Sequence, residues 1–129
     1  MKTFLLDTHT VLWFWWNDPQ LSATATALIC DPANRKFVSM ASPWEVAIKV
    51  SRKKLDIGGE YTGFFDHNMI RSYFEWLQIA TKHLEKVAIL PFHHNDPFDR
   101  LLVAQALTER IPIISADPQL DKYGVQRLW

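Results

Sequence analysis

Cysteine is almost absent from this sequence, since Cys30 is the only one among 129 residues. A single cysteine permits no disulfide within the chain, which fits a reducing compartment. The sequence contains neither a CxxC nor an HExxH pattern, so no zinc site is predicted. A phosphate-binding glycine loop is missing too, because Gly58-Gly59 is too short. No Ser-His-Asp or Cys-His arrangement with convincing context is present, so we expect no catalysis by a nucleophilic side chain.

Long hydrophobic runs are also missing. The most apolar stretch, residues 11–16, is far shorter than the roughly 20 residues that a membrane-spanning helix needs. Lys2 precedes apolar residues 4–6 in the manner of a signal peptide, but Asp7 and His9 interrupt the run and no small-residue cleavage site follows. We therefore expect a cytoplasmic protein that has no membrane segment.

The chain carries no excess charge, because 14 basic residues balance 14 acidic ones. Proteins that hold nucleic acid only by its backbone are usually basic, so the balance argues against a pure binding module. It remains compatible with an enzyme whose acidic centre offsets a basic rim. Candidates for such an RNA-binding rim are Lys49, Arg52, Lys53 and Lys54, although a solvated helix surface explains each of them equally well.

The length suits one domain covering residues 1–129, which would bury roughly two thirds of its unfolded surface. Apolar runs and turn residues predict strands at 2–6, 36–40, 111–115 and 125–128, whereas 75–79 is ambiguous between strand and helix. Helices are predicted at 10–16, 22–29, 42–53, 62–72, 81–87, 96–109 and 118–122. Alternating strands and helices indicate an α/β sandwich with a mainly parallel central sheet.

Two of these helices begin with clear signals. Ser42 is predicted to cap the helix 42–53 and to form a capping box with Glu45, with Pro43 as the first helical residue. In the helix 96–109, Asp96 is the predicted cap and Pro97 the first residue.

Four acidic residues occupy similar topological positions. Asp7 directly follows the first strand, and Asp117 lies two residues after the strand that ends at 115. Glu45 and Asp99 each lie in the first turn of a helix. Because strand ends and the following helix starts meet at one edge of a parallel sheet, all four carboxylates can share one crevice.

Each acid also has a structural explanation. Glu45 suits a capping box or a pair with Lys49 one turn later, and Asp99 suits the helix dipole. Asp117 before Pro118 is an ordinary cap. Asp7 is harder to explain in this way, because it adjoins apolar residues on both sides.

Clustered carboxylates repel one another and take up protons unless a cation is present. Oxygen ligands favour Mg²⁺ or Mn²⁺, and a carboxylate-bound ion of this kind suits phosphodiester hydrolysis. His93 and His94 are not expected to be ligands, because adjacent side chains generally point apart.

Four segments of the chain resemble, in order, the successive motifs of PIN-domain toxins of the VapC type. They are Leu5-Leu6-Asp7-Thr8-His9, Ser42-Pro43-Trp44-Glu45-Val46-Ala47-Ile48-Lys49, Asp96-Pro97-Phe98-Asp99-Arg100-Leu101-Leu102 and Ser115-Ala116-Asp117. No single motif decides the matter, but four in the right order over nearly the whole chain are specific.

The resemblance implies a PIN-like α/β/α sandwich and a Mg²⁺- or Mn²⁺-dependent endoribonuclease. Such toxins commonly form homodimers and are silenced by a cognate antitoxin, through which alone they contact DNA. By resemblance, Asp7, Glu45 and Asp99 match the three core acids and Asp117 the more variable fourth, Asp96 assists beside the site, and Thr8 and Ser115 orient the acids.

Two alternatives stay open. The chain could be a PIN-like scaffold that binds RNA or protein without cleaving, although the presence of all four acids disfavours this. It could also be another Mg²⁺-dependent phosphohydrolase that uses Asp7 as a nucleophile, although Thr8-His9 stands where a second aspartate would be expected. Trp13, Trp15, Trp16 and Trp44 are mostly core residues in our interpretation, and any exposed one would suit a partner surface.

Overall fold

Five short strands form one all-parallel sheet in the computed structural model, which describes residues 1–129. The strands are β1 (Thr3–Leu6), β2 (Arg35–Ser39), β3 (Glu75–Leu77), β4 (Ile113–Ile114) and β5 (Arg127–Leu128), and their order in the sheet is β3-β2-β1-β4-β5. Leu5 of β1 lies opposite Phe37 on one side and Ile113 on the other. The predicted α/β class with a mainly parallel sheet is therefore confirmed.

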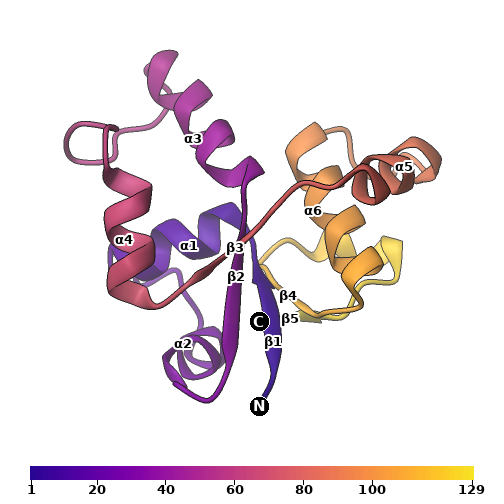
Figure 1. Ribbon diagram of the computed structural model, residues 1–129, viewed down its shortest axis with the longest axis horizontal. Coiled ribbons are helices and arrows are strands. Elements are labelled where there is room, and N and C mark those ends of the chain that lie inside the picture. Colours follow the sequence, from indigo (N-terminus) through magenta and orange to yellow (C-terminus); the bar gives the residue numbers. More distant parts are fainter.

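Helices cover both faces of this sheet, as Figure 1 shows. The helices α1 (Thr8–Trp15), α2 (Ala23–Cys30) and α4 (Phe64–Ser72) lie on the left in that view, and α5 (Thr81–Ile89) and α6 (Pro97–Glu109) lie on the right. The helix α3 (Ala41–Ser51) stands above the sheet at the end towards which the strands run, and the short 3₁₀ helix η1 (Pro118–Tyr123) follows β4. None of these helices is long and apolar enough to span a membrane.

The central strand supplies the core on both faces. Because successive side chains of a strand point to opposite faces, Phe4 and Leu6 join the core beneath α1, α2 and α4, whereas Leu5 joins the core beneath α6. Both cores take a further residue from β4, namely Ile114 on the first face and Ile113 on the second. Burial on both faces explains why these strands read as continuous apolar runs.

The start of α3 differs from the prediction. The helix begins at Ala41, its N-cap residue is Met40, and no side chain caps it. Ser42 lies inside the first turn, where its hydroxyl forms a 2.8 Å hydrogen bond with the hydroxyl of Thr8 instead. The predicted capping box of Ser42 and Glu45 is therefore wrong, because a contact between α3 and α1 uses the serine.

Other boundaries changed less. The ambiguous segment 75–79 contains the edge strand β3, and the predicted strand 111–115 shrinks to Ile113–Ile114, since Pro112 has no N–H to give to a ladder. The start of α6 is confirmed, because the Asp96 carboxylate accepts hydrogen bonds from the backbone N–H groups of Phe98 and Asp99 at 2.8 and 3.2 Å. The tryptophans divide: Trp15 packs against the core, whereas Trp44 is 60% exposed.

Candidate metal centre

The four predicted acids come from four elements that meet above the carboxyl ends of β1 and β4. Asp7 follows β1 and is the N-cap residue of α1, while Asp117 follows β4 and is the N-cap residue of η1. Glu45 lies on α3 and Asp99 on α6, and these two helices contact each other. Strand order explains the meeting, because β1 and β4 are neighbours in the sheet.

Burial and the neighbouring acids raise the pKa of Asp99. Burial raises the pKa of Asp99 to about 8, and the charges of Asp7, Asp96, Glu45 and Asp117 add to the rise. All four of these carboxylates are therefore close enough to repel a charge on Asp99.

Asp7 is the most constrained of the acids. It is buried, and its Oδ2 atom accepts a 2.6 Å hydrogen bond from the Ser115 hydroxyl. Burial raises the pKa of Asp7 and the charge of Glu45 adds to the rise, although the bond from Ser115 and the charge of His9 oppose it. Ser115 thus fixes the direction of the Asp7 carboxylate, but it does not offset the cost of an ionised group at this position.

Glu45 is buried, and only one of its two carboxylate oxygens has a hydrogen-bond partner. Its Oε2 atom accepts a 2.8 Å hydrogen bond from the Lys49 ammonium, whereas its Oε1 atom is buried without any hydrogen-bond partner. Burial opposes a charge on Lys49, yet the bond to Glu45 and the charges of Asp96 and Asp99 raise the pKa of Lys49. Lys49 is therefore engaged inside the acidic cluster, whereas Arg52, Lys53 and Lys54 are exposed just beyond α3.

His94 joins the cluster, which the sequence argument did not foresee. Its Nε2 atom lies 3.1 Å from Oδ2 of Asp117 and 3.3 Å from Oδ2 of Asp99. The side chains of His93 and His94 do diverge, since the His93 ring packs against Tyr123, but one of the pair still points at the acids. The sequence feature that could have indicated His94 is its position two residues before the helix cap Asp96. The backbone N–H of Asp96 donates a hydrogen bond to Nδ1 of His94 at 3.1 Å.

This donor set fits a divalent cation. An unpartnered buried oxygen on Glu45 and the raised pKa values of Asp7 and Asp99 have one common cause, namely carboxylates gathered out of water with too little positive charge. A cation bound by oxygen atoms would remove both costs, and carboxylate oxygen is the ligand type that Mg²⁺ and Mn²⁺ prefer.

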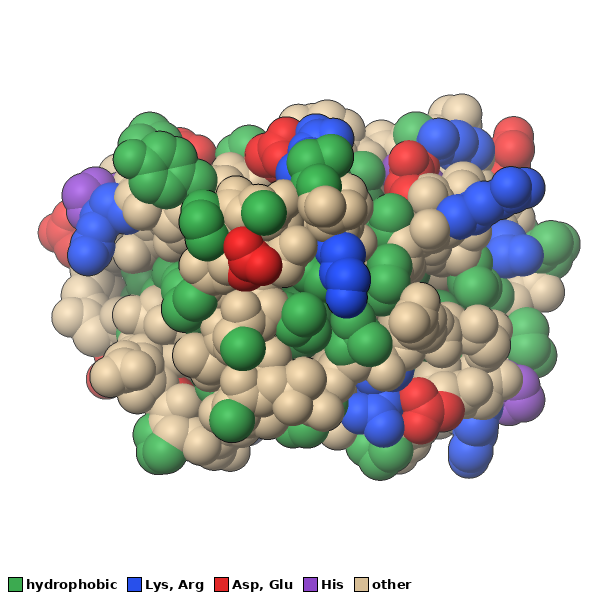
Figure 2. Space-filling view, turned by 90° about the horizontal axis from the view of Figure 1, so that it is seen from below, with side chains coloured by type: hydrophobic (Ala, Val, Ile, Leu, Met, Phe, Trp, Pro, Cys, Tyr) green, Lys and Arg blue, Asp and Glu red, His purple; other side chains and the backbone are tan.

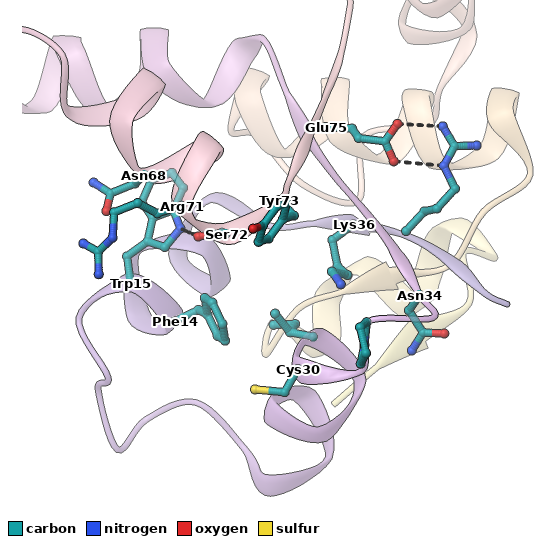
Figure 3. A pocket seen from close by; sticks show the side chains of 13 residues that line it. Phe14, Trp15, Cys30, Asn34, Lys36, Asn68, Arg71, Ser72, Tyr73 and Glu75 are labelled. Carbon is teal, nitrogen blue, oxygen red and sulfur yellow. Dashed lines mark hydrogen bonds and ion pairs between the residues drawn. The ribbon is translucent and has the colours of Figure 1, made fainter.

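The largest cavity of the molecule is separate from this cluster. It has a volume of about 810 Å³ and lies between α1, α2, α4 and the starts of β2 and β3. In Figure 3, Lys36, Phe14 and Tyr73 surround it, and Arg35 pairs with Glu75 at its rim. Figure 2 shows the molecule from below, at the edge where the strands begin, and acidic side chains are scattered singly over this face. None of the four clustered acids lines the cavity, so we place the candidate site at the opposite edge of the sheet.

The sequence pattern of the PIN-domain family matches residues 4–126, which is nearly the whole chain. The chain belongs to the PIN-domain family. The family resemblance seen in the four motifs is thus confirmed. None of the curated proteins matches the sequence significantly.

Solved structures with the same PIN fold include components of toxin–antitoxin complexes. The VapBC2 complex of Rickettsia felis, bound to a DNA fragment from its promoter, contains a chain that is 14% identical with a TM-score of 0.70, over 98% of this chain and 97% of that one. The FitAcB structure of Neisseria gonorrhoeae gives 15% identity and a TM-score of 0.67, over 98% and 96%. A toxin–antitoxin complex of Klebsiella pneumoniae gives 18% identity and a TM-score of 0.59, over 88% and 85%. At these identities the similarity shows a shared fold.

Proposed function

We propose that this PIN-domain protein is a Mg²⁺- or Mn²⁺-dependent endoribonuclease that hydrolyses phosphodiester bonds in RNA. The observation that carries the proposal is the convergence of carboxylates, two of them buried, on Asp99, whose pKa rises to about 8 because of burial and of four neighbouring acids. Such an arrangement of carboxylates lowers the stability of the fold, and arrangements of this kind are typical of functional sites. A bound divalent cation would balance the negative charges.

Asp7, Glu45, Asp99 and Asp117 are the residues that would hold the cation. Bound there, the ion would polarise a phosphate oxygen, lower the pKa of a coordinated water and offset charge on the leaving oxygen. Ser115 orients Asp7 through its 2.6 Å hydrogen bond, and the Thr8–Ser42 contact ties the start of α1 to the start of α3.

Asp96 has a supporting role in this proposal. Its carboxylate accepts the N–H groups of Phe98 and Asp99, which fixes the first turn of α6 and so the position of Asp99. Its charge is also one of those that raise the pKa of Asp99, so it lies close to the site and can act there through a water.

RNA would reach the site over the end of α3. Arg52, Lys53 and Lys54 are exposed there, directly after the helix that carries Glu45. Their ammonium and guanidinium groups would contact phosphates, so binding would weaken with rising salt.

We further propose that the protein is a toxin that a cognate antitoxin protein silences. The support is the fold shared with chains of the VapBC2 and Klebsiella pneumoniae complexes, the first of which is bound to promoter DNA. The balanced charge of this chain suggests that it reaches DNA only through its partner. Trp44 at 60% exposure and Trp16 at 38% are candidate anchors for the antitoxin or for the second subunit of a homodimer.

The test is incubation of structured RNA with the purified protein, with Mg²⁺ and with a chelator. The proposal expects cleavage that needs the metal and that Asp7→Asn abolishes while the circular dichroism spectrum stays unchanged. If the wild-type protein binds RNA but leaves it intact, the scaffold alternative holds. If phosphate becomes trapped covalently on Asp7, the phosphohydrolase alternative holds.

A further inference from the structure

His94 occupies the space between two carboxylates that belong to the proposed metal site. Its Nε2 atom lies 3.1 Å from Oδ2 of Asp117 and 3.3 Å from Oδ2 of Asp99, and these three atoms all lie within 4.8 Å of one another. By distance alone, the histidine could be either a third ligand or a competitor of the cation. The other ring nitrogen decides between them.

The Nδ1 atom of His94 accepts a hydrogen bond from the backbone N–H of Asp96 at 3.1 Å. A donor facing this nitrogen requires that Nδ1 carries no hydrogen, so the network assigns the ring hydrogen to Nε2. Nε2 then has no free electron pair on the side of the acids. It donates its hydrogen to Oδ2 of Asp117, while Oδ2 of Asp99 lies 3.3 Å away. Histidines that bind metals have the reverse arrangement, since their other ring nitrogen donates to an acceptor.

The backbone on both sides of His94 is held firmly. The Tyr123 hydroxyl accepts the backbone N–H groups of His93 and His94 at 3.1 and 2.9 Å. Buried Arg100 donates to the Pro91 carbonyl at 2.8 Å and lies 3.3 Å from the same hydroxyl. The segment between α5 and α6 is therefore anchored, while the His94 side chain itself is 17% exposed to solvent.

We propose that His94 takes the cation's place between Asp99 and Asp117 in the metal-free protein and must swing out when a divalent cation binds both carboxylates. A cation held by Asp99 and Asp117 would face the hydrogen on Nε2 of His94, and the two positive charges would repel each other. Without metal, His94 bridges the two carboxylates through its hydrogen bond to Asp117 and its 3.3 Å contact with Asp99. The loss of these contacts on metal binding lowers the metal affinity of the site. The inference rests on the proposed function, because it concerns the same metal site.

The test is the sign of the change in metal affinity, measured by calorimetry with Mg²⁺ and with Mn²⁺. Removing the competitor in His94→Ala should tighten binding of both ions, by about tenfold, because the hydrogen bond to the Asp117 carboxylate no longer has to break. His93→Ala is the matched control and should bind as the wild type does, since the His93 ring packs on Tyr123 and not on the acids. Weaker or unchanged binding by His94→Ala would overturn the proposal, because a ligand or a bystander would give those results.

A second measurement reads the tautomer directly. Nitrogen-15 NMR of the metal-free protein should show His94 with its hydrogen on Nε2, and Mg²⁺ should shift the His94 ring signals while leaving those of His93 in place. A hydrogen on Nδ1, or a His94 ring that Mg²⁺ does not affect, would contradict the proposal. Neither readout depends on RNA cleavage, so tighter metal binding by His94→Ala in a protein that never cuts RNA would refute only the proposed function.

Discussion

Carboxylates at the two ends of the sheet have opposite environments. At the edge where the strands begin, Glu75 of β3 accepts hydrogen bonds of 2.9 and 2.7 Å from the guanidinium of Arg35 on β2, and the pKa of Glu75 is lowered. At the edge where the strands end, neither Asp7 nor Asp99 has an arginine partner, and the pKa of each is raised. At the first edge an arginine balances the carboxylate, whereas at the second edge Lys49 is bonded only to Glu45 and the pKa values of Asp7 and Asp99 stay raised.

Exposure strengthens the contrast. The side chains of Arg35 and Glu75 are 47% and 43% exposed, so water screens their attraction and the pair contributes little stability. Asp7 and Glu45 are buried at 6% and 3% exposure, where unbalanced charge is most costly. Unbalanced buried charge of this kind occurs at one edge of the sheet and not at the other. This difference is the physical basis of the proposed metal site.

The largest expected effect is on catalysis. Asp99→Asn removes a charge from the centre of the acidic cluster and should lower the rate of RNA cleavage at least about a hundredfold, because the cation loses a ligand. Single-turnover cleavage assays would measure it. The matched control is Asp66→Asn, at an exposed position of α4, which should cleave normally. Comparable rates for the two variants would remove the distinction between the acidic edge and an ordinary surface.

A smaller effect is expected for metal binding. Glu45→Gln keeps the shape of the side chain but removes the charge of a carboxylate that has one unpartnered oxygen. Mg²⁺ affinity measured by calorimetry should fall about tenfold, whereas Glu85→Gln on the exposed side of α5 should leave it unchanged. An unaltered affinity in Glu45→Gln would reduce Glu45 to a partner of Lys49.

The pH dependence of stability gives a third test, without metal. In the unfolded chain Asp99 ionises near its ordinary pKa of 3.8, but in the folded protein it stays protonated up to about 8. Protonation of Asp99 therefore favours folding at low pH, and this contribution is lost as pH rises through the interval from 3.8 to about 8.

Asp99→Asn should abolish this loss. The groups that face Asp99 are Asp7, Asp96, Glu45 and Asp117, with His94 and Lys49 beside them. Near pH 8 the metal-free variant should be more stable than the wild type by on the order of 2 kcal/mol, since the group is partly exposed and screened. Near pH 4 the two should be alike. Thermal melts at several pH values would measure the difference, and a constant difference at all of them would contradict the assigned environment of Asp99.

The smallest effect is expected at the other edge. Arg35→Ala breaks the ion pair with Glu75 and a contact with the Phe37 ring, 5.0 Å away, yet it should leave the melting temperature almost unchanged because water screens the exposed pair. Cleavage and Mg²⁺ binding should not change. Loss of either would show that the two edges are coupled, and the comparison between them would fail.

The sequence predicted the parts of this arrangement that depend on local pattern. Apolar runs predicted the central strands, and Asp96-Pro97 predicted the start of α6 to the residue. The family motifs predicted which four acids belong to the candidate site. The order of the strands places the elements that carry them at one edge of the sheet.

Tertiary contacts determined the rest. Ser42 looked like a helix cap, but it turns to Thr8 on another helix, and a local rule cannot anticipate a partner 34 residues away. Adjacent side chains generally point apart, so His93 and His94 were not expected to be metal ligands. This rule does not say which of the two side chains faces the acids. One carboxylate oxygen of Glu45 is bonded to Lys49 and the other is buried without a partner. The sequence could not predict this difference, because it depends on how deeply the side chain is buried.

The most direct test of the shared cation is a crystal structure of the wild-type protein with Mn²⁺, using anomalous scattering to locate the ion. The account predicts one strong peak within bonding distance of carboxylate oxygens from both Asp7 and Asp99. Mn²⁺ found only elsewhere on the molecule, with these carboxylates bonded to protein atoms or water alone, would contradict it.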